Sequence, residues 1–284
     1  MGGFSRIVRP SRTLADVVEA IWNWEILDRD AARNAASITL PSPFPILSIH
    51  YGEPMWSDRP HGSGYYLHIA TGIQTGVVRF RTSGPSGCVV VRLKPEAAAR
   101  VIGATIPDLT DANVVLDDIF GAAEIGLLQE RLRRAGDCGA RISCVEAFLL
   151  SRLKHDRPDG LAAHAAYRLR CDPAVPVDEL ARGLSVSRRH LNRAFQTMYG
   201  IGPKRFARIV RIGRLLAARR QRNLSWADAA YACGYADQAH MINEFTALIG
   251  TSPRAFFRAP DVDVHHGFNA SLVESHFSNQ FFPF

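Results

Sequence analysis

The stretch Ser187-Arg-Arg-His-Leu-Asn-Arg-Ala-Phe195 decides the fold of the C-terminal half of this 284-residue chain. Ser187 is a good N-cap, because its hydroxyl can accept a hydrogen bond from a free N–H group of the first helical turn. Leu191 and Phe195 are four residues apart, so they share one face of the predicted helix. The opposite face carries the polar side chains Arg188, Arg189, Asn192, Arg193 and Gln196. The pattern predicts an amphipathic helix that packs through Leu191 and Phe195.

A second copy of this unit lies 50 residues further along the chain. The identical pairs are Asp178 and Asp228, His190 and His240, Phe195 and Phe245, Gly200 and Gly250, Pro203 and Pro253, and Phe206 and Phe256. In each copy a short helix rich in small and apolar residues precedes a tight turn and a longer helix, which Ser187 caps in the first copy and Asp237 in the second. A short helix, a turn and a longer helix form the helix-turn-helix pattern.

The outward faces of the two longer helices predict contacts with DNA bases. Arg suits the edge of guanine, and Asn or Gln suits the edge of adenine. We expect base contacts from Arg188, Arg189, Asn192, Arg193 and Gln196 in the first copy, and from Gln238, Ala239, His240 and Asn243 in the second. The second face has no Lys or Arg, and Glu244 on it would repel phosphate, so most of the specificity is expected from the first. The alternative is an ordinary charged helix face.

The segment between the copies predicts one long helix over Pro203–Gln221. Its length would be about 28 Å at about 1.5 Å per residue, comparable with one DNA turn of about 34 Å. Lys204–Arg222 contains eight Lys or Arg residues and no acidic residue. Phosphate contacts are expected from Ser187, Lys204, Arg205, Arg208 and Arg211. One straight helix could therefore hold two reading helices in successive major grooves of a duplex.

The distribution of charge agrees with a polyanionic partner. The net charge is +7, but residues 1–160 are neutral overall, with 18 basic and 18 acidic residues. Residues 161–260 hold 16 Lys and Arg against 6 Asp and Glu, and residues 261–284 hold three acidic residues and no basic one. A basic excess confined to one block is the electrostatic signature of nucleic-acid binding. A solvated basic face is the alternative.

Composition excludes several classes of protein. Hydrophobic residues make up 47% and charged residues 21% of the chain, which is the globular range. No apolar stretch approaches the roughly 18 residues of a membrane span, and no apolar segment of a secretory signal follows Met1. The five dispersed cysteines read as reduced thiols, so a cytoplasmic protein is expected.

At this point the chain resembles the AraC family of bacterial transcription regulators. The resemblance covers roughly residues 161–258, and its most specific pieces are Ser187–Phe195, Gly200–Pro203, Ala229–Tyr235 with Gly234, Phe245 and Gly250–Arg258. It implies a DNA-binding domain of two helix-turn-helix units joined by a long helix. It also implies base contacts from Arg189, Asn192, Arg193, Gln238, Ala239 and Asn243.

Two departures from the family pattern matter. Ser185 lies where the first turn often has Gly, so we expect some strain there. Ala239 and Asn243 replace larger or basic groups, which puts specific reading by the second unit in doubt.

The N-terminal half predicts a β-rich domain followed by two helices. Short β-rich runs at 46–49, 65–69, 77–80 and 89–91 are separated by Gly, Pro, Ser and Asn. The stretch Thr13–Trp24 reads as a helix or as a helix leading into a strand. Amphipathic helices are expected over 124–134 and 140–153, either to pair two protomers in a homodimer or to close the domain's own core. The fold class is therefore α+β, with an antiparallel β-rich N-terminal domain and an all-α C-terminal domain.

The N-terminal half resembles, loosely, the sensor domains of the same family. Aromatic residues that could line an effector pocket are Trp22, Trp24, Tyr51, Trp56, Tyr65 and Tyr66, although such residues also build ordinary cores. His50, His61 and His68 lack the spacing of a metal site, so no metal and no cofactor are expected. The expected domains are 1–157 for sensing or oligomerisation, 161–259 for DNA binding, and a tail over 260–284.

The sequence therefore predicts a sequence-specific, non-enzymatic regulator. Its expected partners are double-stranded DNA, a small-molecule effector and RNA polymerase. No membrane association is expected. Two alternatives stay open: a β-barrel enzyme tethered to DNA, and an architectural protein that binds DNA without sequence preference.

Overall fold

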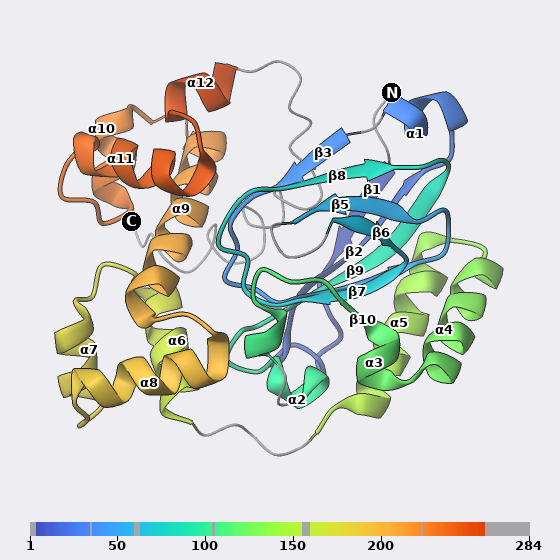
Figure 1. Ribbon diagram of the computed structural model, residues 1–284, viewed down its shortest axis with the longest axis horizontal. Coiled ribbons are helices and arrows are strands. Elements are labelled where there is room, and N and C mark those ends of the chain that lie inside the picture. The colour runs from blue at the N-terminus through green and yellow to red at the C-terminus, as the bar shows by residue number, and fades with distance from the viewer. Residues whose placement is uncertain are drawn as a thin grey trace.

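The computed structural model describes residues 4–34, 36–59, 63–103, 106–154, 160–222 and 224–258. A β-rich N-terminal half is followed by a helical C-terminal half (Figure 1). The strands are β1 Phe4–Val8, β2 Val18–Ile26, β3 Ala36–Thr39, β4 Ile46–His50, β5 Met55–Asp58, β6 Gly64–Tyr66, β7 His68–Thr71, β8 Val78–Thr82, β9 Ser86–Leu93 and β10 Val114–Val115. The helices are α1 Arg29–Asn34, α2 Ala99–Ile102, the 3-10 helix η1 Pro107–Leu109, α3 Leu116–Phe120, α4 Ala122–Arg134, α5 Cys138–Arg152, α6 Leu161–Cys171, α7 Val177–Gly183, α8 Arg188–Tyr199, α9 Pro203–Arg222, α10 Trp226–Ala232, α11 Gln238–Ile249 and α12 Pro253–Arg258.

Two antiparallel sheets form the N-terminal half. The larger has the order β1-β2-β9-β4-β7-β10, and the smaller has the order β3-β8-β5-β6. Strands β4 and β9 are buried along their whole length, whereas β8 alternates between buried and exposed residues. The larger sheet is thus covered on both faces, and the smaller sheet has one face in solvent.

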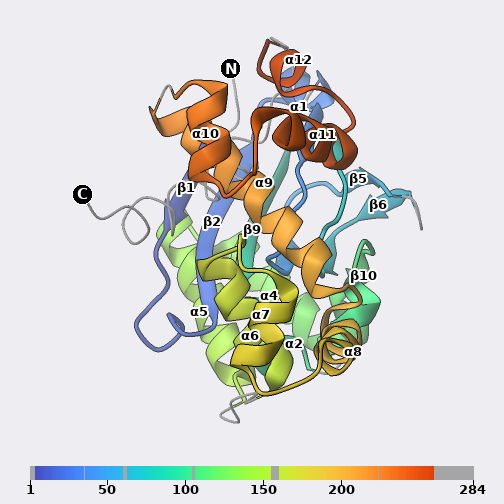
Figure 2. The same ribbon diagram turned by 90° about the vertical axis from the view of Figure 1, so that its left-hand side faces the viewer.

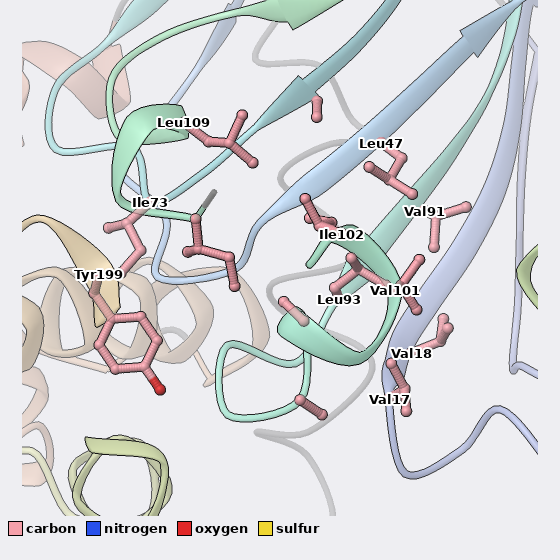
Figure 3. Packing of buried hydrophobic residues seen from close by; sticks show 14 of the residues in the cluster. Val17, Val18, Leu47, Ile73, Val91, Leu93, Val101, Ile102, Leu109 and Tyr199 are labelled. Carbon is pink, nitrogen blue, oxygen red and sulfur yellow. The ribbon is translucent and has the colours of Figure 1, made fainter. Parts of the chain in front are cut away.

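The two faces of the larger sheet belong to different hydrophobic clusters. Trp22, Trp24 and Val90 face the smaller sheet and pack with Phe80 of β8. Ile21 and its neighbours on the other face pack under α2–α5 and reach the C-terminal half. Figure 3 shows this second cluster, in which Tyr199 of α8 lies near Ile73.

The C-terminal half contains two helix-turn-helix units at the two ends of α9. The first is α7 and α8, and the second is α10 and α11 (Figure 1). In Figure 2, α8 and α11 lie on the same side of α9. The first unit shares its hydrophobic cluster with the β-rich half, and the second unit has a separate cluster that includes Leu40 from the N-terminal half.

Most predicted elements are confirmed, with two corrections. The run 65–69 is two strands, because the chain passes from the smaller to the larger sheet at Leu67 between β6 and β7. The stretch Thr13–Trp24 leads into strand β2 and contains no helix. Helices α4 and α5 bury Leu128, Leu132 and Val145 in the chain's own core, as one of the two alternatives predicted. Residues 155–159, where the first expected domain ends, and the expected tail over 260–284 lie outside the described residues.

Candidate nucleic-acid interface

Local signals in the sequence define both ends of α8. The Ser187 hydroxyl accepts a hydrogen bond from the His190 N–H group at 3.2 Å, and Gly200 ends the helix in the left-handed conformation at φ 69°. The second unit repeats both devices: the Asp237 carboxylate accepts from His240 N at 2.7 Å, and Gly250 ends α11 at φ 84°. Each cap satisfies a free backbone group at a helix end.

The two faces of α8 divide as the helical period predicts. Leu191, Phe195 and Tyr199 are fully buried. Arg188, Arg189, Asn192, Arg193 and Gln196 are all exposed. Arg188 lies 3.5 Å from the Asp178 carboxylate, but both side chains are about two-thirds exposed, so this ion pair contributes little. The exposed face of α8 therefore offers three guanidinium groups and two amides to solvent.

The corresponding face of α11 carries one histidine and no Lys, Arg, Asp or Glu. Gln238, Ala239, His240 and Asn243 are exposed, and the His240 ring packs edge-on against Tyr235 with centroids 5.5 Å apart. Nothing on this face attracts phosphate strongly. Its chemistry is limited to hydrogen bonding through the two amides and the imidazole.

The expectation that Glu244 lies on this exposed face is wrong. Glu244 is only 6% exposed, and it points toward α9. Arg211 donates to both carboxylate oxygens, from Nε at 3.1 Å and from Nη2 at 2.9 Å, and Arg208 Nε donates to Oε2 at 3.1 Å. Two cations on α9 thus offset the cost of burying one carboxylate. Glu244 joins the second unit to α9.

This ion pair changes the expected role of the arginines on α9. Arg208 and Arg211, predicted to contact phosphate, point toward Glu244, and the Arg211 side chain is only 14% exposed. Arg205 is exposed but donates to Thr75 Oγ1 in the N-terminal half at 2.8 Å. Lys204 is exposed at the start of α9. Arg208 and Arg211 are ion-paired within the chain, which argues against their predicted phosphate contacts. The contacts of Lys204, Arg205 and Ser187 with phosphate stay predictions.

Contacts tie the first unit to the β-rich half. The Thr110 hydroxyl donates to the Tyr199 carbonyl oxygen at 2.7 Å. Arg170 of α6 is 5% exposed and forms an ion pair with Glu96, to which its Nε donates at 3.3 Å. Burial raises the pKa of the Tyr199 phenol. The position of α8 is therefore coupled to the N-terminal half.

A cavity lies between the two sheets of the N-terminal half. Its lining residues are Trp22, Trp24, Ile46, Ser48, His50, Met55, Ser57, Tyr66, Ile69, Phe80, Cys88 and Val90. Its volume is about 20 Å³, which is room for about one water molecule.

Three of the six aromatic residues predicted to line a pocket do so, namely Trp22, Trp24 and Tyr66. The other three lie elsewhere. Tyr51 hydrogen-bonds to Asn23 and Glu25, Trp56 packs under the Arg81 guanidinium, and Tyr65 is 64% exposed. Trp56 and Tyr65 do not line this cavity because neighbours in a strand point to opposite faces of a sheet, and Tyr51 lies just beyond the end of β4. The same alternation in 46–50 could have found Ser48 and His50.

His50, which lines the cavity, contacts a second histidine, His68. The His50 N–H group donates to His68 Nδ1 at 3.2 Å, and both residues are buried. Burial, with a smaller effect of His68, lowers the pKa of His50 to about 3, so the imidazole is neutral. Among the described residues no three His, Cys, Asp or Glu side chains cluster as metal ligands, and His61 lies outside those residues.

Comparison with known families agrees with this geometry. The family described as "Helix-turn-helix domain" matches residues 180–259, which contain α8, α9 and α11. The C-terminal half of the chain carries an AraC-type helix-turn-helix domain. A second family, described as "Domain of unknown function (DUF6597)", matches residues 6–115. No curated protein matches the chain in sequence.

Three solved structures are similar to this chain to different degrees. A structure of ToxT from Vibrio cholerae matches with a TM-score of 0.50 and 9% identity, covering 90% of this chain and 98% of ToxT. ToxT from Vibrio cholerae O395 matches with a TM-score of 0.46 and 10% identity over 82% of this chain and 95% of that chain. The AraC-like transcriptional activator CuxR matches with a TM-score of 0.27 and 13% identity over 68% and 80% of the two chains. None of the described helices is long and apolar enough to cross a membrane.

Proposed function

We propose that this regulator recognises a specific site in double-stranded DNA, and that α8 supplies most of the specificity. The observation that carries the proposal is the set of five exposed side chains on one face of α8, all capable of hydrogen bonding to base edges. They are Arg188, Arg189, Asn192, Arg193 and Gln196. The proposed role is regulatory and not catalytic.

The second unit has a different proposed part. Helix α9 is 20 residues long, or about 30 Å, so α11 would reach a major groove about one turn away from α8. Gln238, Ala239, His240 and Asn243 would add positioning and a few amide contacts. Ser187, Lys204 and Arg205 would contact phosphates of the DNA backbone near α8.

Selection of bound sequences from random DNA, followed by affinity measurements, tests the proposal. Arg193→Ala is expected to weaken binding to the selected site by about 1–3 kcal/mol and to relax the preference at one base pair. Arg168→Ala, a matched change at an exposed arginine on α6, should leave both unchanged. No enriched sequence, or equal weakening on all DNA, would favour the architectural alternative. An inverted or direct repeat in the selected site would indicate two copies of the chain.

We also propose that a small molecule bound in the N-terminal half controls DNA binding. Two observations support this: the cavity between the sheets, and the Thr110, Arg170 and Arg205 contacts that join this half to α6, α8 and α9. A ligand that moves the sheets would alter these contacts. Control by a ligand requires such a difference between two states.

A further inference from the structure

The cavity between the sheets is lined without a single formal charge. Its twelve lining residues include no Asp, Glu, Lys or Arg, and burial keeps the one histidine, His50, neutral at pH 7. A carboxylate or ammonium group placed there would lose its hydration and gain no opposite charge. The lining therefore selects against charged ligands.

Aromatic rings form much of the wall. Trp22 and Trp24 come from β2 on one side, and Phe80 and Tyr66 come from the smaller sheet on the other. Two sheets that present ring faces or edges to one space favour a flat apolar molecule between them.

One polar group in this wall has unused hydrogen-bonding capacity. His50 is 3% exposed, and its Nδ1 atom has no hydrogen-bond partner among the described residues. The main chain of His50 is held on both sides, since its N–H group donates to His68 Nδ1 and its carbonyl oxygen accepts from Gln129 Nε2 at 3.3 Å. An unpartnered buried ring nitrogen is costly unless a ligand or a water molecule forms a hydrogen bond with it.

The cavity must widen before it can hold a ring. A benzene-sized ligand needs roughly 150 Å³, and the cavity offers about 20 Å³. Tyr66 is the one lining residue that is not buried, and it lies on β6, the edge strand of the smaller sheet. Met55 on the adjoining strand β5 is flexible enough to change rotamer. Access past Tyr66 and space released by Met55 need no change in the larger sheet.

We infer that the cavity binds an uncharged aromatic molecule that carries one hydroxyl-type group, with the rings of Trp22, Trp24 and Tyr66 around its ring and His50 as the hydrogen-bond partner of its polar group. The inference rests on the proposed function only in naming this cavity as the effector site.

The experiment compares p-cresol, p-xylene and 4-methylbenzoate, which share one ring and differ in a hydroxyl, a methyl and a carboxylate group. Binding to the full-length chain without DNA is measured at pH 7 by calorimetry and by the fluorescence of the tryptophans. We expect p-cresol to bind about tenfold more tightly than p-xylene, because only p-cresol can hydrogen-bond to His50. The carboxylate should bind at least tenfold more weakly than p-cresol.

Two variants locate the site. In His50→Phe the preference for p-cresol over p-xylene should fall to about one, while His164→Phe, the same change at an exposed histidine on α6, should preserve it. Cys88→Met adds volume to the cavity wall beside His50, its cross-strand neighbour, and keeps the imidazole, so it should weaken both neutral ligands together. If His50→Phe does not fold, the ranking of the three ligands on the unmodified chain and the effect of Cys88→Met still test the inference.

Three results would overturn the inference. These are tight binding of 4-methylbenzoate, an unchanged preference in folded His50→Phe, or no binding of any probe at millimolar concentration. In each case selection of a specific DNA site by the same preparation would leave the proposed DNA-reading function standing. If the three ligands bind in the expected order but no DNA sequence is selected, the proposed DNA-binding function is wrong and the inferred ligand class still holds.

Discussion

Backbone strain at a single residue distinguishes the turns of the two helix-turn-helix units. Ser185 adopts φ 56°, in the left-handed region, as its position in the first turn predicted. The second turn uses Gly234 at φ 77°, which has no Cβ to clash in this conformation. The first turn therefore carries a strain that the second avoids.

Ser185→Gly should raise the free energy of unfolding by about 0.5–1 kcal/mol, because relief of the left-handed strain exceeds the added freedom of the unfolded chain. Urea unfolding measures this. The reverse change, Gly234→Ala, should lower it by more than about 1 kcal/mol, since a Cβ there would lie 2.7 Å from the Ala174 Cβ. A destabilised Ser185→Gly would show that the serine hydroxyl stabilises the turn.

The pH dependence of stability should reveal the buried His50. Its pKa is about 3 in the folded chain and about 6.5 when unfolded, so below about pH 6.5 the unfolded state binds the extra proton. Stability is therefore lost as pH falls from about 6.5 toward 3, and the loss from His50 between pH 7 and 5 is about 2 kcal/mol. His50→Phe should flatten the curve by this amount relative to His164→Phe. Parallel curves for the two variants would contradict a neutral buried His50.

Among the helices, α9 and α11 show how tertiary contacts reassign charged residues. The sequence period places Glu244 on the outward side of α11 and Arg208 and Arg211 together on α9. Packing brings these three groups together, so that Glu244 forms largely buried ion pairs with both arginines. Arg208 and Arg211 thus hold the second unit in place through Glu244.

Glu244→Gln should lower the free energy of unfolding by about 2 kcal/mol. The full cost of breaking a buried pair is about 3–5 kcal/mol, and it is reduced here because Arg208 is about one-third exposed. Glu179→Gln, at an exposed position on α7, is the control and should have little effect. Equal denaturation midpoints for the two variants would show that the pair contributes nothing.

Salt dependence of DNA binding separates free from structural cations on α9. Lys204→Ala should reduce the slope of log K against log salt concentration by about 0.9, the value for one lost phosphate contact. Arg211→Ala should leave the slope unchanged and reduce stability instead, because Arg211 is paired with Glu244. A slope change in Arg211→Ala without loss of stability would restore Arg211 to the phosphate contacts.

At the scale of the whole molecule, the hydrophobic clusters do not follow the two sequence halves. The β-rich half and the first helix-turn-helix unit share one cluster, which runs from Leu14 to Val210 along the chain. The second unit has its own smaller cluster, which includes the buried Leu40 and has Ile38 and Val77 of the N-terminal half packed against it. The first unit should therefore unfold together with the β-rich half. The second unit should unfold locally at a lower free energy than the first.

Hydrogen exchange should show this division. Amides of α10 and α11 are expected to exchange faster than those of α6 and α8, because the smaller cluster can open alone. Leu40→Ala should increase exchange selectively in α10 and α11, with a cost of about 2–4 kcal/mol. Val91→Ala, in the shared cluster, should affect the sheets and α8 together. Uniform exchange in all four helices would contradict separate opening.

Local signals in the sequence determined the helix-turn-helix units of this protein. The Ser187 and Asp237 caps, the Gly200 and Gly250 ends and the spacing of Leu191 and Phe195 act within one or two helical turns, so they need no knowledge of distant residues. The same reasoning correctly placed the exposed face of α8.

Only the tertiary structure decided how charges and aromatic residues far apart in sequence are paired. The Glu244 pairing, the Thr75 contact with Arg205 and the set of side chains around the cavity depend on which elements meet in space. Strand alternation predicts which residues share a face of the sheet. What that face packs against depends on the order of the strands. That order is a property of the whole fold, because pairing between distant segments, not local preference, determines it.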